Sequence, residues 1–204
     1  NNEYIWSLGG QIEPARWYSV PAVDDQMLFM GTSDFGPAGF LFNYYALDRF
    51  TGEVIWQTSA DSSLYPGAET AVVDLLYDYV ELLDYMAPCV WNNLVIFSSG
   101  DRSVRAFDRY TGDLVWEQSF AMHTSSAPTV AGDRIYLGLD GNDSMQYGMS
   151  GDVQPKLLCL AAADGRVLWN LDVEGKLLSS PVVAGKWIVF GTDRHFFYVL
   201  EEVF

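Results

Sequence analysis

Side chains that could carry out catalysis are few in this sequence of 204 residues. The two histidines, His123 and His195, have no serine or cysteine beside them in the setting of an activated nucleophile. We interpret both as surface or turn residues. Asp48 and Asp108 could form the carboxylate pair of a hydrolase. Each, however, precedes a Thr-Gly pair at the same spacing, which is typical of a turn. The sequence therefore predicts no catalytic residue.

The two cysteines, Cys89 and Cys159, both lie in apolar runs. This position predicts buried thiols, and their spacing fits no zinc pattern. The basic residues are few and scattered, and no glycine-rich phosphate-binding loop is present. With 27 acidic against 11 basic residues the net charge is -16. This balance argues against binding to nucleic acid or to anionic lipid. No apolar run is long enough to predict a transmembrane segment.

One segment resembles the start of a calcium-binding loop, with Asp140, Asn142 and Asp143 as the candidate ligands. Met145 stands where such a loop needs glycine, and Gly151 stands where it needs glutamate. We therefore predict a long flexible hairpin loop over residues 140–156 and no metal site.

The elements that must position these residues are revealed by an internal repeat. A short apolar strand that opens with proline recurs four times, and each copy leads through a turn into a second apolar strand and a glycine. This order is typical of β-hairpins, and proline is tolerated where a strand begins. The four prolines are Pro21, Pro88, Pro128 and Pro181.

A second repeated signature follows the hairpins. Residues 46–56 match residues 106–116 at every landmark, from Ala-x-Asp through Thr-Gly to a tryptophan. Residues 160–169 form a third copy, with Ala162 where the aspartate stands. We interpret the signature as a third strand, a tight turn with glycine at positive φ, and a fourth strand whose tryptophan packs on the neighbouring repeat. Its structural positions are Gly52, Gly112 and Gly165, with Trp56, Trp116 and Trp169.

One unit is therefore four antiparallel strands, and the chain holds four units. The fourth has no fourth strand of its own. Residues 4–6, which end at Trp6, resemble residues 54–56 and are predicted to complete it. The predicted fold is all-β: a single propeller domain over residues 1–204 with four four-stranded antiparallel blades. The blades are placed at about residues 17–60, 86–120, 124–174, and 177–204 together with 3–9.

An insertion at residues 61–86 interrupts the strands. Residues 68–86 have the apolar period of a helix, with Leu76 and Leu83 on one arc and acidic residues on the other. The apolar arc either packs on a patch of the ring or binds a partner. The acidic arc either faces water or binds a basic partner. The acidic residues are Asp74, Asp78 and Glu81.

A glycine- and proline-containing loop at residues 34–40 carries Phe35 and Phe40, which are expected to be exposed. Together with residues 140–156, this loop could form a rim on one face of the ring. Such a rim would be a surface for a partner or a ligand.

These landmarks resemble the PQQ-like β-propeller repeat of quinoprotein alcohol dehydrogenases and of the propeller lipoprotein in outer-membrane assembly. The family usually has seven or eight blades, so the chain is a four-bladed ring, half of an eight-bladed ring made by two chains, or a fragment. The resemblance implies that the dehydrogenases stack PQQ against a disulfide of adjacent cysteines and hold calcium with Glu, Asn and Asp. Cys89 and Cys159 are far apart and no matching calcium set is present, so we expect neither cofactor nor catalysis.

The sequence and the resemblance together predict a non-enzymatic module that binds another protein or a small ligand. The resemblance implies a periplasmic or extracellular setting, in bacterial envelope assembly or sensing. Either a monomer or a dimer that pairs two four-blade halves is compatible with the repeats. The alternative is an enzyme, quinoprotein-like or hydrolytic, that uses the central channel.

Overall fold

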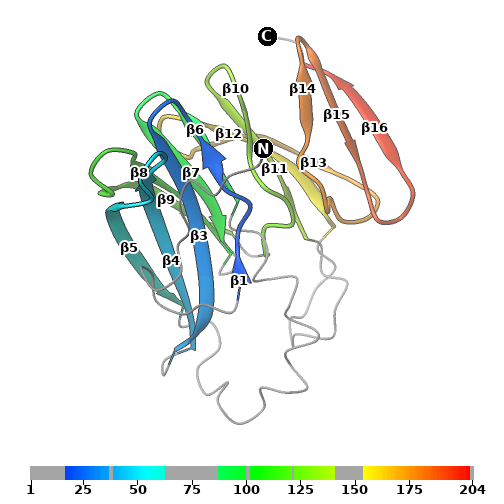
Figure 1. Ribbon diagram of the computed structural model, residues 1–204. Helices are drawn as coiled ribbons and strands as arrows, with labels where there is room; N and C mark the ends of the chain where they lie inside the picture. The colour runs from blue at the N-terminus through cyan, green and yellow to red at the C-terminus, as the bar shows by residue number, and fades with distance from the viewer. Residues whose placement is uncertain are drawn as a thin grey trace, which may run out of the picture.

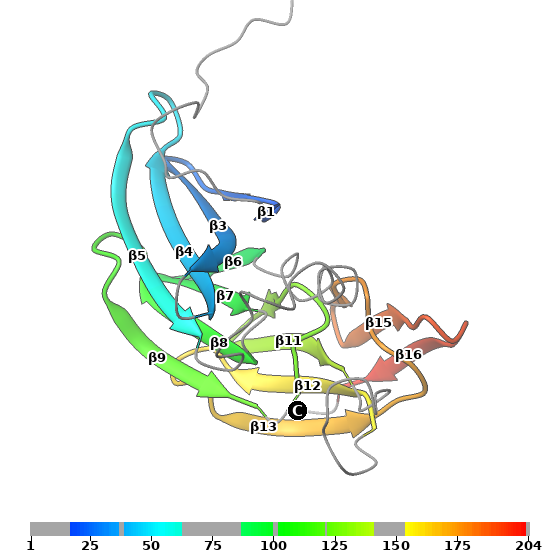
Figure 2. The same cartoon turned by 90° about the horizontal axis from the view of Figure 1, so that it is seen from below.

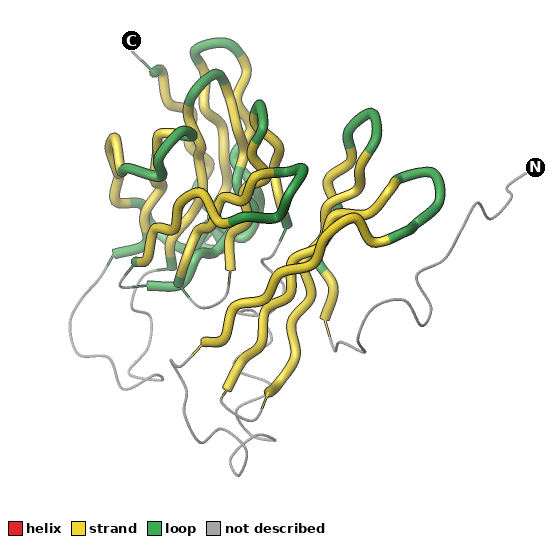
Figure 3. The backbone as a smooth tube through the Cα atoms, turned by 90° about the vertical axis from the view of Figure 1, so that its left-hand side faces the viewer, coloured by secondary structure: helices red, strands yellow, loops and turns green. Residues whose placement is uncertain are grey.

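The computed structural model describes residues 17–36, 39–62, 87–99, 102–120, 122–140 and 154–202. Within these ranges all regular structure is β-strand, as predicted, and Figure 3 shows the strands without a helix among them. Accordingly, no helix in the described part could cross a membrane. The predicted helix at residues 68–86 and the predicted closing strand at residues 3–9 lie outside the described residues.

In the described residues, sixteen strands form four antiparallel sheets, which follow the chain in order (Figure 1). The first sheet contains β1 (Trp17–Tyr18), β2 (Ala22–Val23), β3 (Met27–Gly36), β4 (Gly39–Asp48) and β5 (Val54–Ser62). The second contains β6 (Pro88–Trp91), β7 (Leu94–Ser99), β8 (Ser103–Asp108) and β9 (Leu114–Ser119). The third contains β10 (Thr129–Ala131), β11 (Arg134–Leu139), β12 (Lys156–Ala161) and β13 (Val167–Asp172). The fourth contains β14 (Val182–Ala184), β15 (Trp187–Gly191) and β16 (Phe197–Glu201).

The four sheets are arranged as the blades of a propeller. Figure 2 shows them following one another around a common centre, with β5, β9 and β13 on the outside. The inner strands touch in sequence, β2 against β6, β6 against β10 and β10 against β14. The predicted all-β propeller with four units is therefore confirmed.

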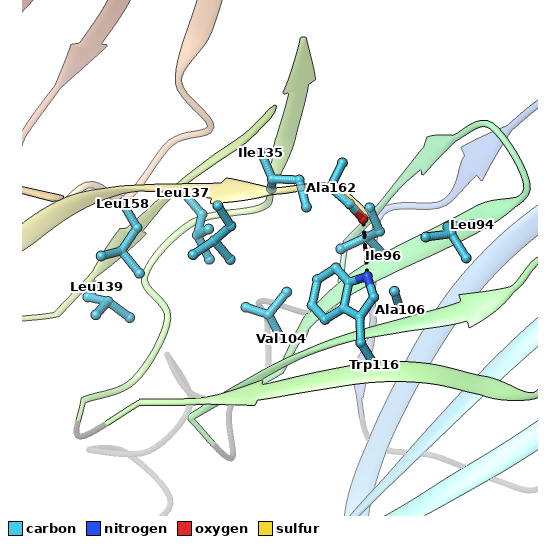
Figure 4. Close-up of a cluster of buried hydrophobic side chains, with 11 residues drawn as sticks. Leu94, Ile96, Val104, Ala106, Trp116, Ile135, Leu137, Leu139, Leu158 and Ala162 are labelled. Atoms are coloured by element: carbon cyan, nitrogen blue, oxygen red, sulfur yellow. Dashed lines mark hydrogen bonds between the residues drawn. The ribbon is translucent and has the colours of Figure 1, made fainter. Parts of the chain in front are cut away.

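Apolar side chains fill the space between successive sheets. The first and second sheets share a cluster that includes Phe29, Tyr44 and Phe97. The second and third share another, shown in Figure 4, in which Trp116 lies beside side chains of both sheets. The third and fourth pack through a cluster that includes Tyr136. Face-to-face packing of sheets through alternating residues thus forms three separate cores along the ring.

The first hairpin differs from the sequence prediction. Phe35 and Phe40 are not in a loop: they lie in β3 and β4 and are paired across the ladder, which leaves only residues 37–38 between the two strands. The same extension makes β5 run to Ser62, two residues into the predicted insertion. The reason is that the aromatic residues on either side favour continued pairing over a loop.

The third signature also needs a correction. Gly52 N donates to Asp48 O, and Gly165 N donates in the same way to Ala161 O. Ala161, and not Ala162, therefore stands at the position of the aspartate. Asp164 stands at the position of Thr51 and makes the same contact, because its Oδ1 accepts the N–H of Arg166 at 3.0 Å as Thr51 Oγ1 accepts that of Glu53 at 3.3 Å.

Candidate protein-binding surface

Two turns of the repeated signature are held rigid by their aspartates, as the sequence predicted. Asp48 Oδ1 accepts the N–H groups of Phe50 and Thr51 at 2.9 and 2.8 Å. Asp108 Oδ1 accepts the equivalent N–H groups at 2.9 and 3.0 Å. These hydrogen bonds, the one from Thr51 first, hold the pKa of Asp48 below its ordinary value of 3.8. The two carboxylates are therefore structural and belong to different sheets.

Each of these turns presents an aromatic ring beneath an arginine. The Arg49 guanidinium lies 5.1 Å from the ring centre of Phe50, and that of Arg109 lies 4.9 Å from the ring centre of Tyr110. Phe50 is 61% exposed and Tyr110 is 48% exposed. Exposed aromatic rings stacked with arginine combine the side chains that most often anchor protein–protein interfaces.

The arginines are themselves fixed. Arg49 Nη1 donates to the carbonyl of Asp24 at 2.7 Å, and Arg109 Nη1 donates to that of Asn92 at 3.2 Å. Arg109 also forms an ion pair with the Asp24 carboxylate of the first sheet at 2.9 Å, and both side chains are largely buried. This contact ties the two turns together. We call Arg49, Phe50, Arg109 and Tyr110 the turn surface.

A buried polar network joins the first two sheets. Tyr44 and Ser99 share a hydrogen bond of 2.6 Å between their hydroxyl groups. Arg105 donates to the Tyr44 hydroxyl at 2.9 Å and to Glu117 at 3.1 Å. Tyr44 and Ser99 are fully buried, and directional hydrogen bonds between buried groups hold the two sheets at a defined spacing.

A cavity of about 650 Å³ lies between the third and fourth sheets. Its walls include Leu168, Leu171 and Leu200, and its polar end is formed by Arg134 and Glu202. The Glu202 carboxylate accepts hydrogen bonds from Arg134, Tyr136 and, at 3.3 Å, Trp169. The charge of this carboxylate is therefore compensated by Arg134, and its contacts join the two sheets.

The thiols are unsuited to nucleophilic chemistry. Cys159 is fully buried next to this cavity, and desolvation, followed by the charge of Glu202, raises its pKa to about 12. Desolvation likewise raises the pKa of Cys89 to about 12. Both remain protonated at neutral pH, whereas a catalytic thiol needs a lowered pKa. They lie in different sheets, in β6 and β12, and so do not fit the paired cysteines that the family resemblance associates with PQQ.

The structure places the remaining candidate residues as follows. His123 is buried, which corrects the prediction of a surface or turn residue, because the connection around it is tied to the third sheet by the bridge between Thr124 and Leu139. His195 lies in a turn with a φ of 67°, as expected. Asp140 is buried and faces Lys176 at 3.7 Å, and the described residues contain no cluster of three or more metal-binding side chains. Outside the described residues lie Leu76, Leu83, Asp74, Asp78, Glu81, Asn142, Asp143 and Trp6.

Sequence reasoning missed the turn surface. The signal was an aromatic residue between Asp-Arg and Thr-Gly in both well-matched copies, at Phe50 and Tyr110. Taken alone, the sequence of these segments predicts only turns. The third sheet has Ala162 and Ala163 at the equivalent positions, so the surface is confined to the first two sheets.

Comparisons with known proteins agree with this architecture. The family profile described as outer membrane protein assembly factor BamB matches residues 5–153 and 146–201. BamB of Shewanella oneidensis is 28% identical over 142 residues, which cover 67% of this chain and 34% of that protein. The quinoprotein alcohol dehydrogenase PedH of Pseudomonas putida is 24% identical over 180 residues, which cover 85% of this chain and 26% of that protein. The chain thus spans between a quarter and about a third of the length of these curated relatives.

Solved structures share the fold. The computationally designed Ika4 protein superposes with a TM-score of 0.67 at 12% identity, covering 98% of this chain and 99% of that protein. The designed Ika8 protein has a TM-score of 0.61 at 11% identity, covering 90% of this chain and 45% of that protein. The quinohemoprotein alcohol dehydrogenase of Comamonas testosteroni has a TM-score of 0.58 at 16% identity, covering 87% of this chain and 31% of that protein. From its repeats, its sheets and the profile that spans them, this chain belongs to the PQQ-like family of the outer membrane protein assembly factor BamB.

Proposed function

We propose that this chain is a non-enzymatic propeller module that binds another protein through its turn surface, in the assembly of the bacterial outer membrane. The observation that carries the proposal is the pair of arginine-stacked, exposed aromatic rings at equivalent positions of neighbouring sheets. Membership of the BamB family supports the assembly role and a periplasmic location.

The geometry favours a protein as the ligand. Phe50 and Tyr110 are exposed on rigid turns, as the anchors of a protein interface are before binding. Because Arg49 and Arg109 are already held by backbone carbonyls, little side-chain entropy is lost when a partner covers them. A partner with an apolar or acidic strip would match both kinds of side chain.

The proposal is tested by photo-crosslinking in the periplasm of a Gram-negative host. A benzophenone amino acid is placed at Phe50 or at Tyr110, with Phe196 as the matched control, because it is 49% exposed and lies in the fourth sheet's β15–β16 connection. We expect the first two positions to capture the same partner and the control not to capture it. No adduct at Phe50 and Tyr110, or the same adducts at Phe196, would overturn the proposal.

The crosslinked partner is then purified and its affinity measured. Phe50→Ala and Tyr110→Ala are each expected to weaken binding about tenfold or more, the usual effect of truncating an interface anchor. Thr58 is half-buried on β5, and Thr58→Ala is the control, which is expected to leave the affinity unchanged.

The enzymatic alternative is tested separately by titration with PQQ and calcium. The relation to PedH makes this test necessary. We expect no spectral change of the quinone, because the described residues offer neither paired cysteines nor a calcium cluster. Micromolar binding would favour the quinoprotein alternative.

A further inference from the structure

Asp24 contacts both arginines of the turn surface. Its backbone carbonyl accepts the hydrogen bond from Arg49 Nη1 at 2.7 Å, and its Oδ2 lies 2.9 Å from Nη2 of Arg109. Arg49 lies over the ring of Phe50 in the first sheet, and Arg109 lies over the ring of Tyr110 in the second. One residue, in the turn between β2 and β3, therefore holds both halves of the turn surface.

Asp24 is itself fixed by its own turn. Its Oδ1 accepts the N–H groups of Gln26 and Met27 at 2.8 and 2.7 Å. This is the hydrogen bonding of an Asx turn, in which the side chain bonds to its own backbone two residues on. The two oxygens of the carboxylate thus have separate roles, because Oδ1 closes the turn while Oδ2 reaches the second sheet.

The ion pair between Asp24 and Arg109 is largely shielded from water. The Asp24 side chain is 17% exposed and that of Arg109 is 19% exposed. Within the part of the chain that the structure describes, no hydrogen bond reaches Asp24 Oδ2, so Arg109 is the group that compensates its charge. Because a pair in this position is screened little by salt and water, the attraction holds the guanidinium close to one place.

The backbone of Arg109 is also held by both sheets. Its carbonyl accepts the indole N–H of Trp56 at 2.8 Å, and its N–H donates to the carbonyl of Asn93 at 2.9 Å. The ion pair with Asp24 extends this restraint to the end of the side chain. The ring of Tyr110 lies under that guanidinium, with 4.9 Å between them, so the place of the ring depends on the ion pair.

The interface between the second and third sheets is built without such an ion pair. By strand register, Trp91 stands in the second sheet where Asp24 stands in the first. Trp91 also reaches the following sheet, where its Nε1 donates to Gly132 O at 2.6 Å. The third sheet has Ala162 at the position of Arg109 and offers no cation there. The acid is therefore present where the next sheet has the arginine, and it accompanies the turn surface rather than sheet packing in general.

The ion pair also determines what the second turn offers to a partner. Arg109 Nη1 donates to the carbonyl of Asn92 and Nη2 is paired with Asp24, whereas Tyr110 is 48% exposed. The second turn therefore presents an aromatic ring and not a free cation. An apolar strip of a partner matches this half of the turn surface better than an acidic strip does.

We propose that Asp24 is the positioning residue of the turn surface. By fixing Arg109, it holds the ring of Tyr110 at a constant distance from the ring of Phe50, so that both rings receive one apolar strip of the same partner protein. This role rests on the proposed function, since it belongs to the same surface. Asp24 acts through Arg109, because its own carboxylate is largely buried.

Spin labels test the positioning without a partner. They are attached at Thr51→Cys and Thr111→Cys, two exposed and equivalent positions beside the rings, in the full chain with both native cysteines replaced by alanine. We expect one narrow distance by electron paramagnetic resonance, and a broader distribution for Asp24→Asn, which keeps Oδ1 for the turn but removes the charge. Asp25→Asn is the matched control, because Asp25 is exposed on the same turn, and it should leave the distance narrow. A distribution that Asp24→Asn leaves equally narrow would overturn the proposal.

Photo-crosslinking tests whether the positioning matters for capture. With the benzophenone amino acid at Tyr110, Asp24→Asn is expected to lower the yield of the partner adduct by about two- to tenfold relative to the yield from Phe50, because a freed side chain has to be ordered on binding. A loss of stability alone would lower both yields alike, and Asp25→Asn should change neither. An unchanged ratio of the two yields would overturn the role of Asp24 in capture. No adduct from either position would contradict the proposed function but not the positioning, which the spin-label distance decides.

Discussion

The indole ring of Trp56 lies directly on Gly112 of the neighbouring sheet. A Cβ atom added to Gly112 would be 2.7 Å from Cδ2 of Trp56, and one added to Gly165 would be 2.5 Å from Cε3 of Trp116. Trp56 Nε1 donates to Arg109 O at 2.8 Å, and Trp116 Nε1 donates to Ala162 O at 3.1 Å. The tryptophan and the glycine of the signature are therefore partners between repeats, which explains why both must recur.

Gly112→Ala is expected to destabilise the protein by about 2–4 kcal/mol, the sum of a left-handed backbone penalty and of overpacking. Gly112 has a φ of 77°, which disfavours any side chain, and the new methyl group would collide with the indole. Urea unfolding followed by tryptophan fluorescence measures the loss.

Gly132→Ala is the control for that measurement. Gly132 has a φ of 61° but nothing within 4 Å of an added Cβ, so only the backbone penalty of about 1–2 kcal/mol applies. Equal losses at Gly112 and Gly132 would show that the tryptophan contact contributes nothing.

Much of the fold could be predicted from the sequence, because the same turn, proline and tryptophan residues recur in successive repeats. The positions of turns, of strand-opening prolines and of Trp56 and Trp116 all follow from residue types with strong local preferences. That these tryptophans pack on the neighbouring repeat was predicted too. Which backbone each would meet was not predictable, since it depends on how far one sheet is rotated relative to the next.

Long-range pairing explains what the sequence did not predict. The segment with Phe35 and Phe40 has the glycines and proline of a loop, yet the ladder continues through it. His123 lies in a connection that is buried because it pairs with the third sheet, and the local sequence contains no signal of this pairing.

Tyr44→Phe is expected to cost about 1–3 kcal/mol, because the change removes an acceptor from the buried guanidinium of Arg105 and a partner from Ser99. Urea unfolding measures this loss, and a double-mutant cycle with Ser99→Ala isolates the hydroxyl pair. Tyr110→Phe, which removes a hydroxyl from a half-exposed ring, serves as the control with little expected change. If the two tyrosine variants are equally stable, the network does not hold the sheets together.

Asp48→Asn is expected to destabilise the protein at neutral pH and to lose that effect in acid. The pKa of Asp48 in the folded protein is below its ordinary value of 3.8, owing first to the N–H of Thr51 and then to that of Phe50. The ionised carboxylate therefore stabilises the fold above about pH 4, and this contribution disappears as the pH falls through the folded pKa. Urea midpoints at about pH 7 and about pH 3 report the change. A constant difference between the variant and the natural protein would contradict it.

Cys159 is expected to make folding stability fall in alkali. In the unfolded chain the thiol ionises near its ordinary pKa of 9.0, whereas burial beside Glu202 raises the pKa in the folded protein to about 12. The unfolded state therefore loses a proton that the folded state keeps, and the free energy of unfolding decreases from about pH 9 upward. Cys159→Ala removes this contribution, so the stability gap between the natural protein and the variant should narrow as the pH rises. Unfolding curves taken at successive pH values test this, and parallel curves would show that the thiol ionises equally in both states. The same burial predicts that native Cys159 resists a thiol reagent until a denaturant is added.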